Sequence, residues 1–153
     1  PDTAQMGTSM PRTGAGSLEL VLNQIPNSFA GVFQDVLGLS GGQTVTYTGW
    51  HKSTADPGGT EIRIEFRDSI NDVEISRTPN FAPSVGSVYE PFLLDAVVPV
   101  GADSARVVYA IQSFGAGPFQ SVFVDDVSFV PEPGSLSLLV LAGLGLLRLR
   151  RSH

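Results

Sequence analysis

Hydrophobic and polar residues alternate along most of this chain. The clearest alternation runs through residues 61–67, where Ile62, Ile64 and Phe66 fall on one side of an extended chain and charged residues fall on the other. A period of two predicts a β-strand with one buried face and one face in water. Similar segments recur between turns rich in Gly, Pro, Asn and Asp. The predicted strands are residues 18–23, 29–37, 44–52, 61–67, 73–77, 89–98, 105–112 and 121–130.

This succession of strands, without an amphipathic helix between them, predicts a single all-β domain. Short antiparallel strands with frequent turn signals are typical of a β-sandwich, and connections of Greek-key length favour a jelly roll. We therefore predict an antiparallel jelly-roll β-sandwich over residues 18–130. Residues 1–17 are rich in Gly, Ser and Thr, and we expect them to be irregular. Because the chain starts at Pro1 without a secretory signal, we expect it to be a fragment of a longer protein.

Residues 131–153 differ in composition from everything before them. Residues 134–147 carry no charge, and Arg148 begins a basic cluster. As a helix these fourteen residues would be about 21 Å long, shorter than the roughly 30 Å hydrocarbon core of a bilayer. Arginine snorkelling and local thinning of the bilayer allow such a helix to span. We therefore predict a short C-terminal transmembrane helix, with a buried helix of the globular domain as the alternative.

The order of these parts resembles the PEP-CTERM sorting signal of Gram-negative bacteria: a Pro-Glu-Pro box, an apolar segment and a terminal arginine cluster. The two prolines keep the box extended, because each disfavours helix before it. For the box alone, a plain proline-rich linker is the alternative. The signal residues that the resemblance assigns are Pro131, Glu132, Pro133, Arg148, Arg150 and Arg151.

The resemblance to this signal implies a route out of the cell. An exosortase, which is a membrane protease-transferase, would recognise the box and cut the chain near it. Before processing, residues 134–147 would anchor the protein in the inner membrane. After processing, the protein would reach the cell surface or the extracellular matrix.

A second resemblance concerns the body of the chain. Residues 32–36 with 42–50, residues 98–107 and residues 122–129 resemble carbohydrate-binding modules with a galactose-binding-like jelly roll. The match extends over about residues 15–130. Its residues are mostly core and turn positions, so it implies the fold more strongly than a ligand.

Charge and cysteine content exclude several classes of function. The net charge is −6, and with Glu132 and the three tail arginines set aside, fourteen acidic and six basic side chains remain. Such a surface does not favour nucleic acid or docking on anionic lipid. The chain contains no cysteine, which excludes a disulfide scaffold, a thiolate zinc site and a cysteine nucleophile.

Trp50, His51 and Tyr89 are the predicted ligand contacts. Sugar rings stack on exposed aromatic faces, and His, Asn or Gln side chains bind hydroxyl groups. Tyr47 and Trp50 fall on opposite sides of the predicted 44–52 strand, so one of the two belongs to the core. Core packing is the alternative role for Trp50 and Tyr89.

Asp125 and Asp126 are adjacent within a predicted strand, where aspartate is unfavourable. In the modules that the chain resembles, one such aspartate helps to hold a structural Ca²⁺ ion with oxygen ligands from the N-terminal strand. Carboxylate and carbonyl oxygens suit that ion. Alternation predicts the two side chains on opposite faces, so at most one would be a ligand. The alternative is an aspartate that caps a turn or a neighbouring backbone N–H.

The sequence offers little support for catalysis. No spacing selects a pair of carboxylates, and no Gly-x-Ser-x-Gly motif accompanies His51 or His153. We therefore predict an exported surface or matrix protein whose non-catalytic sandwich binds a glycan or exopolysaccharide. A purely structural matrix protein and a glycan-active enzyme or its accessory module are the alternatives.

Overall fold

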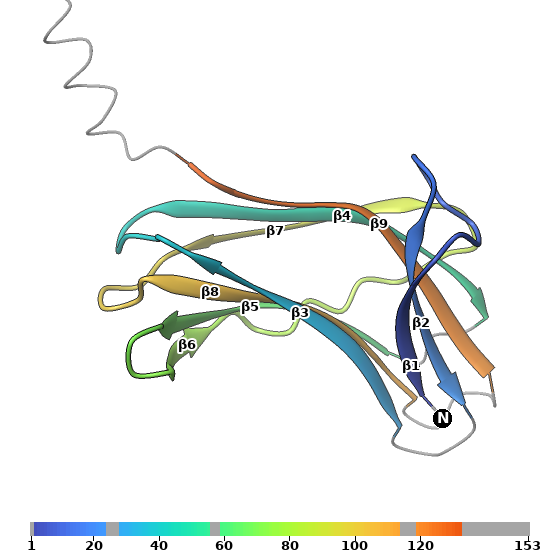
Figure 1. Ribbon diagram of the computed structural model, residues 1–153, viewed down its shortest axis with the longest axis horizontal. Helices are drawn as coiled ribbons and strands as arrows, with labels where there is room; N and C mark the ends of the chain where they lie inside the picture. Colours follow the sequence, from blue (N-terminus) through green and yellow to red (C-terminus); the bar gives the residue numbers. More distant parts are fainter. Residues whose placement is uncertain (1, 24–27, 56–58, 114–118, 133–153) are drawn as a thin grey trace, which may run out of the picture.

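The computed structural model describes residues 2–23, 28–55, 59–113 and 119–132, which form a sandwich of two antiparallel sheets (Figure 1). The strands of this described part are β1 (Thr3–Gly7), β2 (Ser17–Asn23), β3 (Phe29–Leu37), β4 (Thr44–Ala55), β5 (Gly59–Asp68), β6 (Val73–Arg77), β7 (Glu90–Val97), β8 (Ser104–Gln112) and β9 (Phe119–Pro131). One sheet has the strand order β1-β2-β9-β4-β7, and the other has the order β3-β8-β5-β6.

The chain changes sheet at most of its connections, which is the arrangement of a jelly roll. Only β1–β2 and β5–β6 are neighbours both in sequence and within a sheet, and β9 returns to lie between β2 and β4. Figure 1 shows β4, β7 and β9 in one layer and β3, β5, β6 and β8 in the other. The predicted all-β antiparallel sandwich is therefore confirmed.

The N-terminal segment differs from its prediction. Residues 1–17 were expected to be irregular, but Thr3–Gly7 forms strand β1 and pairs with β2, with Thr3 opposite Val21 and Gly7 opposite Ser17. The segment has weak alternation of its own, so its strand conformation depends on the edge of β2 that it completes. Other strand limits move little: β4 continues to Ala55, and β9 continues to Pro131.

The predicted C-terminal helix, residues 134–147, lies outside the described residues, and so do Pro133, Arg148, Arg150 and Arg151. Within the described part of the chain, no helix is long and apolar enough to cross a membrane.

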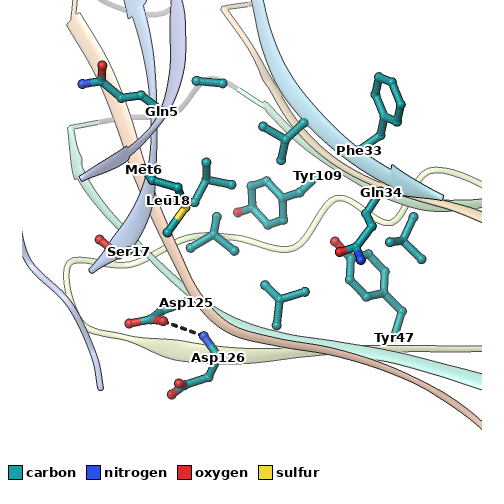
Figure 2. A pocket seen from close by; sticks show the side chains of 15 residues that line it. Gln5, Met6, Ser17, Leu18, Phe33, Gln34, Tyr47, Tyr109, Asp125 and Asp126 are labelled. Atoms are coloured by element: carbon teal, nitrogen blue, oxygen red, sulfur yellow. Dashed lines mark hydrogen bonds between the residues drawn. The ribbon is translucent and has the colours of Figure 1, made fainter. Parts of the chain in front are cut away.

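At one edge of the sandwich the two layers border a cavity of about 490 Å³ that is open to solvent on one side (Figure 2). Its wall comes from both sheets: β1, β2, β4 and β9 contribute from one side, and β3 and β8 contribute from the other.

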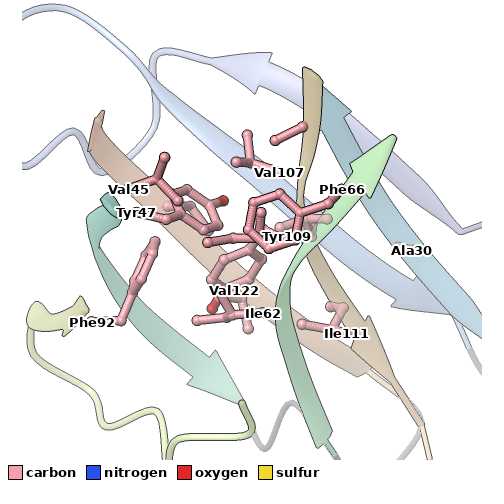
Figure 3. Packing of buried hydrophobic residues seen from close by; sticks show 14 of the residues in the cluster. Ala30, Val45, Tyr47, Ile62, Phe66, Phe92, Val107, Tyr109, Ile111 and Val122 are labelled. Atoms are coloured by element: carbon pink, nitrogen blue, oxygen red, sulfur yellow. The ribbon is translucent and has the colours of Figure 1, made fainter. Parts of the chain in front are cut away.

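The core fills the rest of the space between the sheets (Figure 3). Ile62 and Ile64 of β5 are fully buried, as their alternation predicts. Aromatic rings occupy the centre, where Phe92 lies edge-on to Tyr47 with the ring centroids 5.4 Å apart and lies 5.6 Å from the ring of Tyr109. The remaining fully buried large side chains are Leu20, Leu22, Val45, His51, Val98, Ile111, Val122 and Val124.

Candidate functional site

The outer face of the four-stranded sheet carries two exposed aromatic side chains on one strand. Phe29 and Phe33 of β3 are 50% and 62% exposed. They point to the same side because they are four residues apart on a strand. Gly31 lies between them, and a Cβ atom there would be only 2.8 Å from Cζ of Phe29, so the ring of Phe29 lies over this glycine.

Arg106 of β8 completes this surface. Its guanidinium group lies 4.1 Å from the ring centroid of Phe33. Two hydrogen bonds to Asp35 hold the guanidinium in place, from Nε to Oδ1 at 2.7 Å and from Nη2 to Oδ2 at 2.9 Å. These bonds lower the pKa of the Asp35 carboxyl group and raise the pKa of Arg106. We call Phe29, Gly31, Phe33 and Arg106 the aromatic face.

A row of hydrogen-bonding side chains runs beside the aromatic face on β8 and β5. Gln112 Nε2 donates to Glu61 Oε1 at 2.7 Å. Arg63 donates from Nη1 to Glu61 Oε2 at 3.2 Å and from Nε to Glu65 Oε1 at 2.7 Å. We call Gln112, Glu61, Arg63 and Glu65 the polar ladder.

The register of the strands places the two sets of side chains together. Phe29 is opposite Gln112, and Phe33 is opposite Val108, which is itself opposite Arg63. Between Phe29 and Phe33, Gly31 is opposite Ala110, so only small residues separate the two rings. The result is a surface with two flat apolar rings next to fixed donors and acceptors, which is the combination that sugar recognition uses.

The predicted contacts Trp50 and Tyr89 lie on the outer face of the other sheet. Residues 8–16, which connect β1 to β2, cover them. The guanidinium of Arg12 lies 3.7 Å from the ring centroid of Trp50, and the Tyr89 hydroxyl donates to the carbonyl oxygen of Met10 at 2.8 Å. The core member of the Tyr47–Trp50 pair is Tyr47, which is 3% exposed.

His51 lies on the opposite side of β4 from Trp50 and is 1% exposed. Its Nδ1 is 2.7 Å from the hydroxyl oxygen of Tyr109. Burial lowers the pKa of its imidazole, against a smaller raising effect of Glu90. The structure therefore places His51 in the core, where it does not share a surface with Trp50 and Tyr89, and we do not retain it as a ligand contact.

Asp125 and Asp126 lie at a β-bulge, and this corrects the expectation that they face opposite sides. Two residues of β9, Asp126 and Val127, stand opposite the single residue Gly49 of β4. Asp126 has φ of 48°, a conformation that aspartate tolerates better than most residues. A bulge interrupts alternation, and both carboxylates reach the 8–16 connection.

The two carboxylates are occupied by residues 12 and 13. The backbone N–H groups of Arg12 and Thr13 donate to Asp125 Oδ2 at 2.7 and 3.2 Å. The Arg12 guanidinium and the Thr13 hydroxyl donate to Asp126, and these bonds lower the pKa of its carboxyl group.

This arrangement does not fit a calcium ion, since a guanidinium already supplies the positive charge. Among the described residues, no three His, Cys, Asp or Glu side chains gather as a metal site. The capping role that the sequence left open is the one these hydrogen bonds show.

The Pro-Glu-Pro box begins inside the last strand. Pro131 is opposite Val45, the N–H of Glu132 donates to the carbonyl oxygen of Thr44 at 2.9 Å, and Gln43 Nε2 donates to the carbonyl oxygen of Glu132 at 3.0 Å. The box is therefore attached to the sheet through its first two residues.

Comparison with known proteins supports the fold. No family model matches the sequence, and no curated protein matches it. The enzymatically active domain of tailspike protein 4 of bacteriophage CBA120 matches with a TM-score of 0.71 and 19% identity, over 86% of this chain and 18% of the tailspike chain. A family 16 carbohydrate-binding module matches with a TM-score of 0.60 and 16% identity, over 83% of this chain and 84% of the module. A family 4 carbohydrate-binding module matches with a TM-score of 0.59 and 15% identity, over 86% and 91%.

At these identities the likeness shows the fold alone. The chain spans about a fifth of the tailspike chain but most of each carbohydrate-binding module. The fold is therefore an antiparallel β-sandwich similar to that of these carbohydrate-binding modules.

The aromatic face is not among the sites predicted from the sequence. The segment 29–37 has apolar residues on both sides of the strand, with Phe29 and Phe33 on one side and Ala30 and Val32 on the other. Its alternation could not say which side is buried. A usable signal was the size of the residues, because two phenylalanines flanking a glycine suit a flat surface better than an interior layer.

Proposed function

We propose that the domain is a non-catalytic glycan-binding module and that the aromatic face with the polar ladder is its binding surface. The observation that carries the proposal is the pair of exposed rings of Phe29 and Phe33, held on one strand beside fixed hydrogen-bonding groups on a carbohydrate-binding-module fold. The solved carbohydrate-binding modules support this function through their shared architecture.

The spacing of the two rings suits an oligosaccharide. Phe29 and Phe33 are four residues apart, which is about 13 Å along a strand at 3.3 Å per residue. One sugar ring is shorter than this span. The ligand is therefore a segment of a polysaccharide chain that stacks on both rings, while Gln112 and Glu61 exchange hydrogen bonds with its hydroxyl groups.

The charges favour a neutral glycan. On the polar ladder Arg63 is paired with both Glu61 and Glu65, and beside the ring of Phe33 the Arg106 guanidinium is paired with Asp35. An acidic polysaccharide would compete with these carboxylates for the arginines, and it would also be repelled by the net charge of −6.

Alanine substitution on the two sheets tests this assignment. The full chain would be titrated with cellohexaose, xylohexaose and a β-1,4-galactan by calorimetry, using wild type, Phe33→Ala, Trp50→Ala and the matched control Leu93→Ala. Leu93 is exposed to a similar degree on the outer face of the other sheet. Loss of one stacking ring, worth about 0.5–1.5 kcal/mol, should weaken binding about two- to tenfold in Phe33→Ala alone.

Several results would contradict the proposal. A loss confined to Trp50→Ala would move the site to the other sheet. Absence of binding to every glycan would favour a structural matrix protein, and turnover of a glycan would show an enzyme.

We also propose that the protein is exported and sorted as an exosortase substrate. This proposal rests on the PEP-CTERM resemblance of residues 131–153. Because Pro131 and Glu132 are bonded to β4, a cut that follows Glu132 would leave the sheet intact. The test is the mass of the mature protein in cells with and without an exosortase. An identical uncut mass in both would refute sorting.

A further inference from the structure

The cavity between the layers lies behind the aromatic face. Val32 and Gln34 of β3 line it, while the ring of Phe33 points away from the other lining side chains in Figure 2. Most of the wall is apolar. The complete lining is Ala4, Gln5, Met6, Ser17, Leu18, Val32, Phe33, Gln34, Tyr47, Val107, Tyr109, Val124, Asp125, Asp126 and Val127.

A buried hydroxyl group without a partner faces this space. Tyr47 is 3% exposed, and its hydroxyl makes no hydrogen bond to any described residue. It differs from the other tyrosine of the wall, because the Tyr109 hydroxyl is engaged by His51. In the described part of the chain, Oγ of Ser28 is the only side-chain nitrogen or oxygen that is both inaccessible to solvent and without a hydrogen-bond partner. The Tyr47 hydroxyl is therefore accessible from the cavity.

A second polar group lies on the same wall. Gln34 belongs to the inner side of β3, in register with Val107 of β8, and its carboxamide makes no hydrogen bond within the described residues. Gln34 and Tyr47 both line the cavity. The accessible Tyr47 hydroxyl and the carboxamide of Gln34, an exposed residue, can each donate to and accept from a molecule bound in the cavity.

We propose that this cavity binds a neutral, mainly apolar small molecule that carries one hydroxyl or carbonyl group, with Tyr47 and Gln34 as its hydrogen-bonding partners. The volume of about 490 Å³ is roughly three times that of the ~150 Å³ cavity that accepts benzene. It also lies within the ~300–1,000 Å³ range of ligand pockets. A molecule with two fused rings fits this space.

The electrostatics select a neutral ligand. Asp125 and Asp126 belong to the rim, and the chain as a whole is acidic, so a carboxylate would be repelled. Burial raises the pKa of Tyr47, so its hydroxyl stays protonated and can donate. This site and the proposed glycan surface lie on opposite sides of β3 and share only Phe33, and the cavity proposal does not depend on glycan binding.

The two methionines of the chain provide a direct readout. Met6 lines the cavity, whereas Met10 lies in the 8–16 connection and does not. The full chain with ¹³C-labelled methionine methyl groups would be titrated with 2-naphthol, which is neutral at pH 7. The expected result is a saturable shift of the Met6 methyl resonance and an unchanged Met10 resonance.

Two variants with matched controls locate the site. Tyr47→Phe removes only the hydroxyl, so it should weaken 2-naphthol binding about three- to tenfold and leave naphthalene binding unchanged. Val127→Phe should block the cavity, while Val130→Phe, at a similarly exposed position of β9 that does not line the cavity, should not. The anion 2-naphthoate should bind more weakly than 2-naphthol.

The proposal is overturned if the Met6 methyl does not shift up to the solubility limit of 2-naphthol. It is also overturned if both methyl groups shift together, or if Val127→Phe and Val130→Phe bind the probe equally well. Phe29→Ala, which alters the aromatic face but not the cavity wall, should leave 2-naphthol binding intact. Failure of the glycan titration therefore leaves this result interpretable.

Discussion

Gly49 of β4 is a position where one added methyl group should be costly. It lies opposite the bulge of β9, and its Cβ direction points into the core. A Cβ atom there would lie 2.5 Å from Cζ and 2.7 Å from Cε1 of Phe92, and 3.2 Å from Cγ2 of Val127. The first two distances are far shorter than carbon atoms tolerate, so the ring of Phe92 would have to move.

The ring of Phe92 cannot move without displacing other core side chains. It is 2% exposed and packs against Tyr47, His51 and Tyr109, with centroid distances of 5.4, 5.4 and 5.6 Å. Forcing an extra carbon into such a core costs about 1–3 kcal/mol. Alanine also restricts the unfolded chain more than glycine does, and this effect offsets up to about 1 kcal/mol of that cost. We therefore expect Gly49→Ala to lower the free energy of unfolding by about 1–2 kcal/mol.

The matched control is Gly31→Ala on β3. The added Cβ would lie 2.8 Å from Cζ of Phe29, a half-exposed ring that can turn into solvent, and 3.0 Å from Cβ of Ala110, a contact that a shift of a few tenths of an ångström relieves. Gly31→Ala should therefore cost less than Gly49→Ala. Urea unfolding followed by circular dichroism, with comparison of midpoints at equal slopes, measures both. Equal stability of Gly49→Ala, Gly31→Ala and wild type would refute the packing argument.

Two further predictions concern protons and metal. Burial lowers the pKa of His51, so as the pH falls the unfolded state binds a proton at this residue before the folded state does. The contribution of His51 to the free energy of unfolding should therefore be complete above about pH 6.5 and should be lost as the pH drops through the folded-state pKa. Melting temperatures between about pH 7 and pH 5 should show this slope in wild type and less of it in His51→Gln, and an equal slope in both would contradict the assignment. Because Arg12 and Thr13 already satisfy Asp125 and Asp126, we expect calcium chloride to leave the melting temperature equal to that in EGTA. A rise with calcium concentration would show a bound ion.

The prediction from the sequence was correct where apolar and polar residues alternate unambiguously along a strand. In β5, charged residues alternate with Ile62, Ile64 and Phe66, and the buried side of this strand follows from the sequence alone. The class of fold follows as well, since short alternating strands between turns can bury their apolar sides only by stacking two sheets. Strand β1 was missed because its residues alternate weakly and are held by β2.

Tertiary structure decided the rest, because it depends on contacts between distant segments. Tyr47 and Trp50 are an odd number of residues apart on one strand, so the sequence showed that they face opposite sides. Only the packing of the two sheets put Tyr47 inside and Trp50 under Arg12. The bulge at Asp125 and Asp126 arises from pairing with β4, so alternation along β9 could not reveal it.

The candidate site shows the same division. The sequence by itself determined an all-β sandwich of alternating strands, because burial of one strand face is a local property with a period of two. Which apolar face of β3 meets water, and which residues stand beside Phe29 and Phe33, was decided by register with β8 and β5. These strands come from distant parts of the chain, and only their pairing brings an exposed aromatic row, a polar ladder and a cavity into one structure.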